Sequence, residues 1–251
     1  MLSEERKDRI LEILEQKKYA STNKLSQDLF CSVATVRREL IELENKGLVK
    51  RYHGGVSLIP QTNMELPRVF REKEAQEEKI YISDLATLFI TNGQAIFLDA
   101  SSTVNTLCSY LENYSNLKVI TNGIKTALDL SMLSNLSSFF AGGKINLYSN
   151  ATVGEMTNVF LTNFKMDIAF ISCRGIDENG LYEADYEQAE VKKHMILNSD
   201  KTIVLCDDSK FEKSHFYKLA PFEKIHTVIS NKPPKKSIIK NIELAGSDIT
   251  W

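Results

Sequence analysis

Apolar residues near the start of the chain recur every three or four positions, a spacing that predicts amphipathic helices. We predict a first helix over residues 4–18 and a second over residues 22–29. The third predicted helix carries an apolar stripe made of Val33, Val36, Leu40 and Leu43. Gly47 follows, where a glycine commonly ends a helix. Because so few residues separate the second and third helices, the pattern predicts a helix-turn-helix.

Two strand-like segments, LVKRYH and VSLI, flank the pair Gly54 and Gly55. A glycine pair between such segments predicts a two-stranded hairpin. A hairpin directly after a helix-turn-helix predicts the wing of a winged-helix domain.

The third predicted helix turns the adjacent Arg37 and Arg38 away from its apolar stripe. Two exposed arginines are typical of an ordinary solvated face, and we expect at least one of them to pair part of the time with Glu39, Glu42 or another acid. In a helix-turn-helix the same arginines favour bidentate contacts with guanine, whereas basic residues of the wing hold phosphates. The residues expected to contact DNA are Ser21, Thr22, Ser32, Ala34, Thr35, Arg37, Arg38, Lys50, Arg51, His53 and Gly54.

The pattern changes after residue 58. Residues 59–74 contain two prolines and read as a linker. From residue 75 onward short apolar segments such as AIFLD, LKVIT and TIVLC alternate with helical segments. This alternation predicts an α/β domain over residues 75–251, with a mainly parallel sheet covered by helices on both faces. The predicted organisation is therefore a winged helix-turn-helix domain at 1–58, a linker, and a larger α/β domain.

Ligands of parallel sheets bind beyond the carboxyl ends of the strands. Five predicted strands end here in small or polar residues, which are ASST, NG, GGK, CRG and DDSK. The serines of ASST suit a phosphate, although simple capping of the next helix also explains them. The candidate ligand-binding residues are Asp99, Ser101, Ser102, Thr103, Asn122, Gly142, Gly143, Lys144, Arg174, Gly175 and Lys210.

Residues 21–55 resemble the N-terminal domain of the DeoR family of bacterial transcriptional regulators. In that family a Ser-x-x-Thr-Ile-Arg-Arg-Asp-Leu run forms the recognition helix and an Arg-x-His-Gly-Gly run closes the wing. The matching residues here are Ser32, Thr35, Arg37, Arg38, Leu40, Arg51, His53, Gly54 and Gly55. Phe30 and Cys31 depart from the family pattern, in which a small residue or glycine and a valine are usual. They lie in the turn and not on the reading face.

The resemblance continues through LDASST, ITN, AGGK, FISCRGID and DDSKF and so covers nearly the whole chain. It implies an effector domain whose fold is similar to that of ribose-5-phosphate isomerase. The effector domain would bind a phosphorylated sugar or related metabolite, and this binding would release operator DNA. The catalytic Asp-Gly-Ala-Asp-Glu stretch of the isomerase is absent, because residues 172–177 read SCRGID. We therefore expect no catalysis.

The net charge differs between the two predicted domains. Residues 1–58 contain 11 basic and 9 acidic residues, a net charge of +2, whereas the rest contains 20 and 24, a net charge of −4. Because +2 is weakly basic, we expect DNA affinity to depend on assembly as a homodimer or homotetramer.

The four cysteines have no metal-ligand spacing, and nucleotide-binding glycine motifs are absent, so we expect no metal and no cofactor. No apolar run approaches the roughly 20 residues of a membrane span, and we expect a cytoplasmic protein.

The favoured hypothesis is a repressor of a sugar uptake or catabolism operon, released from double-stranded operator DNA by a phosphorylated sugar. A sugar-phosphate isomerase or hydrolase with an accessory DNA-binding domain is the alternative, and it requires a carboxylate placed to move a proton in the pocket. A transcriptional activator is the third hypothesis. Acidic residues near the strand ends could bind sugar hydroxyls instead, namely Asp99, Asp177, Glu183, Asp207 and Asp208.

Overall fold

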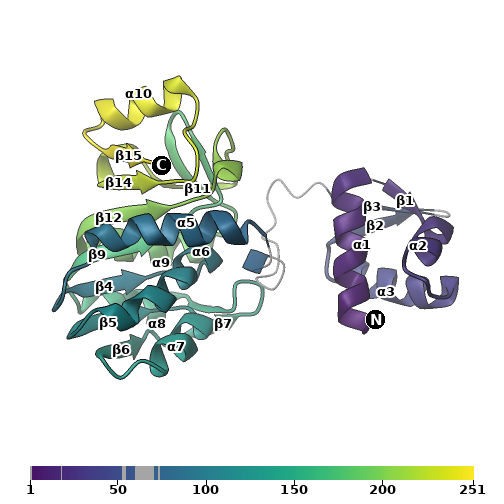
Figure 1. Cartoon of the computed structure of the whole chain (residues 1–251), viewed down its shortest axis with the longest axis horizontal. Helices are drawn as coiled ribbons and strands as arrows, with labels where there is room; N and C mark the ends of the chain where they lie inside the picture. Colours follow the sequence, from purple (N-terminus) through teal and green to yellow (C-terminus); the bar gives the residue numbers. More distant parts are fainter. Residues whose placement is uncertain (1, 18, 53–54, 60–70, 73) are drawn as a thin grey trace. The chain divides into compact units, whose positions relative to one another are not determined.

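The computed structural model describes residues 2–17, 19–52, 55–59, 71–72 and 74–251. The chain divides into two compact units, residues 1–62 and residues 63–251. The N-terminal unit holds the helix-turn-helix and the other holds a parallel α/β sheet (Figure 1), so the predicted fold class is confirmed. Among the described residues, no helix is both long enough and apolar enough to cross a membrane.

The N-terminal unit is built from three helices and a small antiparallel sheet. Its elements are α1 (Ser3–Lys17), β1 (Tyr19–Ser21), α2 (Thr22–Asp28), α3 (Val33–Asn45), β2 (Val49–Tyr52) and β3 (Gly55–Leu58). The strands lie in the order β1-β3-β2. The predicted hairpin is present as β2 and β3, and β1 adds a third strand that the sequence did not predict. Leu14 of α1, Leu25 of α2 and Leu40 of α3 are fully buried between these elements.

The turn between α2 and α3 bends through a residue with a left-handed backbone. Phe30 has φ 51° and its side chain is 95% exposed. A residue with a Cβ is disfavoured in this conformation, which glycine adopts readily. The hydroxyl of Ser26 donates to the carbonyl oxygen of Cys31 at 2.6 Å and holds the turn closed.

The larger unit is built around a seven-stranded sheet. Its strands lie in the order β15-β14-β12-β9-β4-β5-β6, and every pair is parallel. The strands of this sheet are β4 (Ala95–Leu98), β5 (Leu117–Thr121), β6 (Leu136–Phe140), β9 (Met166–Ile171), β12 (Ser199–Leu205), β14 (Thr227–Ile229) and β15 (Asp248–Thr250). The helices are α5 (Gln76–Ala86), α6 (Ser102–Thr106), α7 (Ile124–Ser131), α8 (Glu155–Thr162), α9 (Tyr186–Leu197) and α10 (Lys236–Leu244), with short 3₁₀ turns η1 (Thr87–Phe89), η2 (Leu107–Asn113), η3 (Asp208–Lys210) and η4 (Phe222–Lys224).

Alternate residues of the central strands face two separate apolar layers. Phe97 of β4 packs on the side of α8 and α9, whereas its neighbours Ile96 and Leu98 pack on the side of α5 and η2. Successive side chains of a strand point to opposite faces, so each strand fills both layers. Helices therefore cover both faces of the sheet, as predicted, and the carboxyl ends of β4, β9 and β12 meet at one edge (Figure 1).

Two smaller antiparallel elements were not predicted. One is the hairpin of β7 (Lys144–Asn146) and β8 (Ala151–Val153), and the other is the sheet of β10 (Gly175–Asp177), β11 (Gly180–Glu183) and β13 (Tyr217–Ala220). Strands of three or four residues are too short to show a period in sequence.

Candidate functional site

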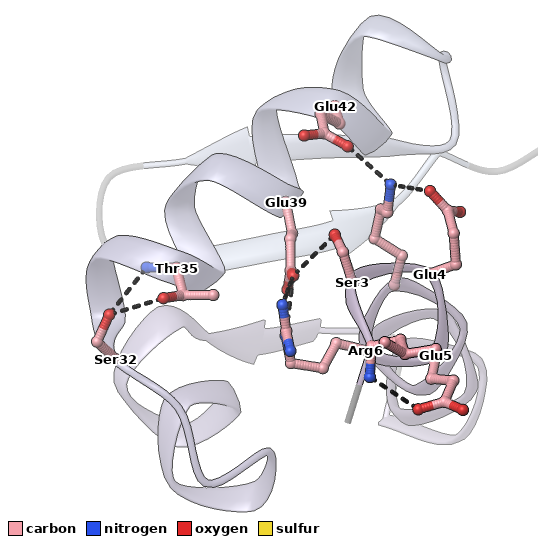
Figure 2. A network of polar contacts seen from close by, with 10 residues as sticks. Ser3, Glu4, Glu5, Arg6, Ser32, Thr35, Glu39 and Glu42 are labelled. Carbon is pink, nitrogen blue, oxygen red and sulfur yellow. Dashed lines mark hydrogen bonds and ion pairs between the residues drawn. The ribbon is translucent and has the colours of Figure 1, made fainter.

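Ser32 fixes the start of α3. Its hydroxyl oxygen accepts a hydrogen bond from the backbone N–H of Thr35 at 3.1 Å, and the two hydroxyl oxygens lie 2.9 Å apart (Figure 2). Such an N-cap satisfies a backbone donor that the helix itself leaves unpaired. Ser21 caps α2 in the same way by accepting from the backbone N–H of Lys24.

The face of α3 that was predicted to read DNA is open. Ala34, Arg37 and Arg38 are exposed, and Thr35 is half-buried. Within the described residues, neither arginine forms a hydrogen bond or an ion pair, and the charge of Arg38 acts on Glu42 only by helping to lower its pKa.

Those two glutamates instead tie α3 to α1. Glu39 is buried and accepts from Arg6 at 2.6 Å and from the hydroxyl of Ser3 at 3.2 Å (Figure 2). Glu42 pairs with Lys7 at 2.7 Å, which lowers the pKa of Glu42, while hydrogen bonds to Glu4 and Glu42 raise the pKa of Lys7. Because these acids are engaged from α1, both arginines stay available to a ligand.

Part of the predicted wing is also engaged. Arg51 Nε lies 2.7 Å from Glu44 Oε2, and the backbone N–H of Arg51 donates to the same carboxylate. These bonds lower the pKa of Glu44. Both side chains, together with Arg37 and Thr22, line a surface depression of about 410 Å³. Lys50 is exposed, whereas His53 and Gly54 lie outside the described residues.

The larger unit contains a cavity of about 510 Å³ beyond the carboxyl ends of β4, β9 and β12. This volume is within the range of small-molecule sites. Five of the predicted ligand-binding residues line it, namely Ser101, Ser102, Thr103, Arg174 and Lys210. The hydroxyl of Ser101 caps α6 and donates to Asp99, so capping accounts for that one hydroxyl.

Basic and acidic side chains both line the cavity. The basic residues are Arg71, Lys79, Lys210 and Lys213, and the acidic ones include Glu74, Glu78, Asp207 and Asp208. Lys210 pairs with Asp207 at 3.6 Å, and Lys79 is buried. Lys79 Nζ donates to the carbonyl oxygens of Arg71 and Glu74, the latter at 2.6 Å, but forms no ion pair with a carboxylate of the described residues. Burial lowers the pKa of Lys79 to about 8, against the opposing influence of nearby Asp207. An anion in the cavity would stabilise this poorly solvated ammonium group.

A second, buried group of charges lies at the floor of the cavity. Lys192 Nζ contacts Asp99 Oδ2 at 3.2 Å, the carboxylate of Glu183, and the carbonyl oxygen of Ser172 at 2.8 Å. Asp99 also accepts from the backbone N–H groups of Ser101 and Ser172. Glu183 and Lys192 line the cavity, whereas Asp99 lies directly beneath them. This arrangement places hydrogen-bond donors and acceptors where hydroxyl groups of a ligand could bind.

Six of the eleven predicted residues do not line the cavity, namely Asp99, described above, and five others. Asn122 is buried and donates from Nδ2 to the carbonyl oxygen of Thr152, which joins β5 to the β7–β8 hairpin. Lys144 is exposed and pairs with Glu187 at 2.9 Å. Asn122 follows β5 and Lys144 follows β6. Both strands lie beyond β4 in the strand order, on the side away from β9 and β12, whose carboxyl ends border the cavity.

The remaining three of these residues are glycines, and two of them leave space for neighbouring atoms. A Cβ at Gly143 would lie 2.2 Å from Thr157 Oγ1, and one at Gly175 would lie 2.2 Å from the carbonyl oxygen of Lys213. A Cβ at Gly142 would meet no atom within 4 Å, and this glycine does not line the cavity either. Close packing, and not ligand contact, accounts for Gly143 and Gly175.

Sequence reasoning missed the two buried lysines. Lys79 and Lys192 stand on apolar faces of helices, beside Ile82 in α5 and Met195 in α9. A lysine at the spacing of buried residues was the available signal, since lysine is almost never fully buried unless it is paired. Within the described residues, no group of three His, Cys, Asp or Glu is arranged to hold a metal.

Both units match known families. The DeoR-like helix-turn-helix domain matches residues 6–62, and the DeoR C terminal sensor domain matches residues 74–232. The glycerol-3-phosphate regulon repressor of Escherichia coli is 30% identical, covering 96% of this chain and 95% of that protein. The transcriptional repressor GlcR of Bacillus subtilis is 31% identical, covering 99% and 96%.

Solved structures give a more partial likeness. The ribose 5-phosphate isomerase from Plasmodium falciparum matches with a TM-score of 0.39 and 19% sequence identity, covering 54% of this chain and 52% of that chain. This chain therefore spans about half the length of that isomerase.

Proposed function

The chain belongs to the DeoR family of transcriptional regulators, and we propose that it represses transcription from an operator that it releases when a phosphorylated sugar or related metabolite fills its cavity. Relatives along nearly the whole chain are named as repressors, one of them of a glycerol-3-phosphate regulon. A regulator of chromosomal DNA works in the cytoplasm, and we place the protein there on that ground.

The exposed face of α3 is the main observation that supports DNA binding. Arg37 and Arg38 project from a capped helix whose acids are engaged elsewhere, Glu39 and Glu42 by α1 and Glu44 by Arg51. A guanidinium group without an internal partner can make a bidentate contact with guanine in the major groove. The capping and first residues of α2 and α3 would approach the sugar-phosphate backbone of DNA, and they include Ser21, Thr22, Ser32 and Thr35. Lys50 and Arg51 of the wing would bind phosphates.

Arg51 must leave its ion pair with Glu44 before it can bind a phosphate. Exposed ion pairs contribute little in water, so a phosphate could replace the carboxylate at small cost.

The cavity suits a ligand with an anionic end and a hydroxylated end. Lys79 would neutralise a phosphate, and its charge would be stabilised in turn because burial disfavours it. Lys210 would contribute by exchanging its 3.6 Å pairing with Asp207 for the phosphate. Glu183 and Gln188 line the cavity as partners for hydroxyl groups. Glu183 is a carboxylate in the pocket, as the isomerase alternative requires, but it is held by Lys192.

Arg71 supports a route from cavity to DNA. It lines the cavity, and its carbonyl oxygen accepts from Lys79 and from the hydroxyl of Ser102. In sequence it directly follows residues 60–70, which lead back to the N-terminal unit. A ligand that changes these contacts would favour an arrangement that binds DNA poorly, by no more than its preference between the two arrangements.

The test is operator selection followed by titration. We expect wild-type protein to select a two-fold operator from random duplexes and to release it when one of a panel of sugar phosphates is added. Arg37→Ala or Arg38→Ala should weaken operator binding by about 1–3 kcal/mol, while Arg9→Ala on α1 should not. Normal binding by both α3 variants would contradict the recognition surface.

The same preparation separates the alternatives. Turnover of a sugar phosphate, lost in Glu183→Gln, would favour an isomerase or hydrolase over a regulator. Increased reporter transcription in the presence of the protein would identify an activator.

A further inference from the structure

Exposed apolar side chains gather in one part of the larger unit. Of the 21 large hydrophobic residues that are exposed among the described residues, nine lie between positions 128 and 159. They are Leu128, Met132, Phe139, Phe140, Ile145, Leu147, Tyr148, Met156 and Val159. They belong to α7, β6, the β7–β8 hairpin and α8, and we call this region the edge surface.

The elements of the edge surface adjoin one another. α7 follows β5 and packs against β6, the last strand of the sheet. Phe139 of β6 contacts Phe164 just after α8, with ring centroids 6.2 Å apart and ring planes tilted by 44°, and Phe164 in turn contacts Phe160 within α8. The region therefore extends over both faces of the sheet at β6.

The edge surface is poor in charge. Residues 124–164, which span its elements, contain only Lys125, Asp129, Lys144 and Glu155 as charged residues, whereas a quarter of the whole chain is charged. Depletion of charge together with exposed aromatic residues and methionine is the composition of the core of a protein interface.

β6 is also an uncovered strand edge. It ends the strand order of the sheet, and its sequence LSSFF contains no charged residue and no proline. Four of its five residues are exposed. Edges that remain in water are usually short, charged or interrupted, because free N–H and C=O groups pair with other strands. An edge without such protection is expected where another chain covers it.

We propose that the edge surface binds a second copy of this chain, with the two β6 strands paired antiparallel about a two-fold axis. Taking roughly 150 Å² for a fully exposed large side chain, the nine residues offer about 800 Å², which matches what each partner of a stable complex buries. The choice of a second copy over another protein rests on the proposed function, because a two-fold operator requires a two-fold dimer.

The sequence of β6 suits this symmetry. With the axis at Ser138, the central residue, Phe139 lies opposite Ser137 of the partner subunit, and Phe140 lies opposite Leu136 of the partner subunit. In the first pair a large side chain faces a small one, and in the second two apolar side chains meet.

Sedimentation velocity of the full chain tests the surface. We expect wild-type protein at about 10 µM to sediment as a dimer or tetramer, and Met132→Glu/Met156→Glu to have half that mass, with the dissociation constant raised at least about a hundredfold. The control Leu88→Glu/Leu244→Glu changes equally exposed residues elsewhere and should keep the wild-type mass. Because all four residues are exposed, a circular dichroism spectrum like that of wild type is expected throughout.

A cysteine cross-link tests the axis. Ser138→Cys should form a disulfide between two copies under mild oxidation, because directly opposed residues of antiparallel strands lie within disulfide distance. Exposed Ser109→Cys, outside the edge surface, should not. A monomeric wild type, or an edge variant with wild-type mass, overturns the proposal. Operator binding by wild-type protein is measured separately. A failure of the proposed function would appear in that titration and not in the sedimentation or cross-linking experiments.

Discussion

Replacement of Lys192 by methionine probes the buried charges at the cavity floor. Lys192 is the cation between two carboxylates, Asp99 and Glu183, and all three side chains are buried. Methionine keeps most of the volume but leaves two negative charges close together without their counter-ion. Removal of one partner from a buried ion pair costs about 3–5 kcal/mol. Asp99 keeps its backbone N–H donors, so we expect the lower end, about 3 kcal/mol.

Urea unfolding followed by the fluorescence of Trp251, the one tryptophan of the chain, measures this loss. The matched control is Lys193→Met, the same change at the next position. Lys193 is half-buried and pairs with Glu190 at 3.1 Å, and its loss should cost at most about 1 kcal/mol. Glu183→Gln should restore part of the stability of the Lys192→Met variant, since it removes one of the unpaired charges. Equal midpoints for the two lysine variants would refute the reasoning.

Three further predictions concern other regions. Because the pKa of Lys79 is about 8 in the folded chain and near 10.4 when unfolded, the unfolded state binds more protons between those values. The stability of wild type relative to Lys79→Met should therefore rise from pH 8 to pH 10 in urea unfolding, and a flat difference would contradict this. Phe30→Gly should stabilise the N-terminal unit by about 1 kcal/mol, because glycine relieves the positive φ and no packing is lost; hydrogen exchange of α3 amides measures it, and faster exchange would count against it. Arg6→Ala should speed exchange in α3 by leaving buried Glu39 without its cation, whereas Arg9→Ala, which breaks an exposed pair, should leave it unchanged.

Much of the architecture followed from periodicity. The apolar stripe of α3, the cap at Ser32 and the alternation of apolar strands with helices are local features, and the structure confirms each. Residues three or four positions apart share a helix face, and strands without polar interruption are buried on both faces. A reader of the sequence can therefore place elements before any contact between them is known.

The site was predictable only in part. Ser101, Ser102 and Thr103 follow β4, which lies beside the central strand β9, and all three line the cavity. Lys144 ends an equally polar segment, but its strand end is at the margin. Strand order decides which ends meet, and no local pattern encodes that order.

By itself the sequence determined the helix-turn-helix, the parallel α/β class and the exposed arginines of α3, because each depends on residues close together along the chain. Only the tertiary structure decided what the charged residues do. Glu39 turned out to hold α1, and Lys192 to hold two carboxylates from separate strands. The energy of a charge depends on its burial and on partners distant in sequence, so its role is a property of the folded chain.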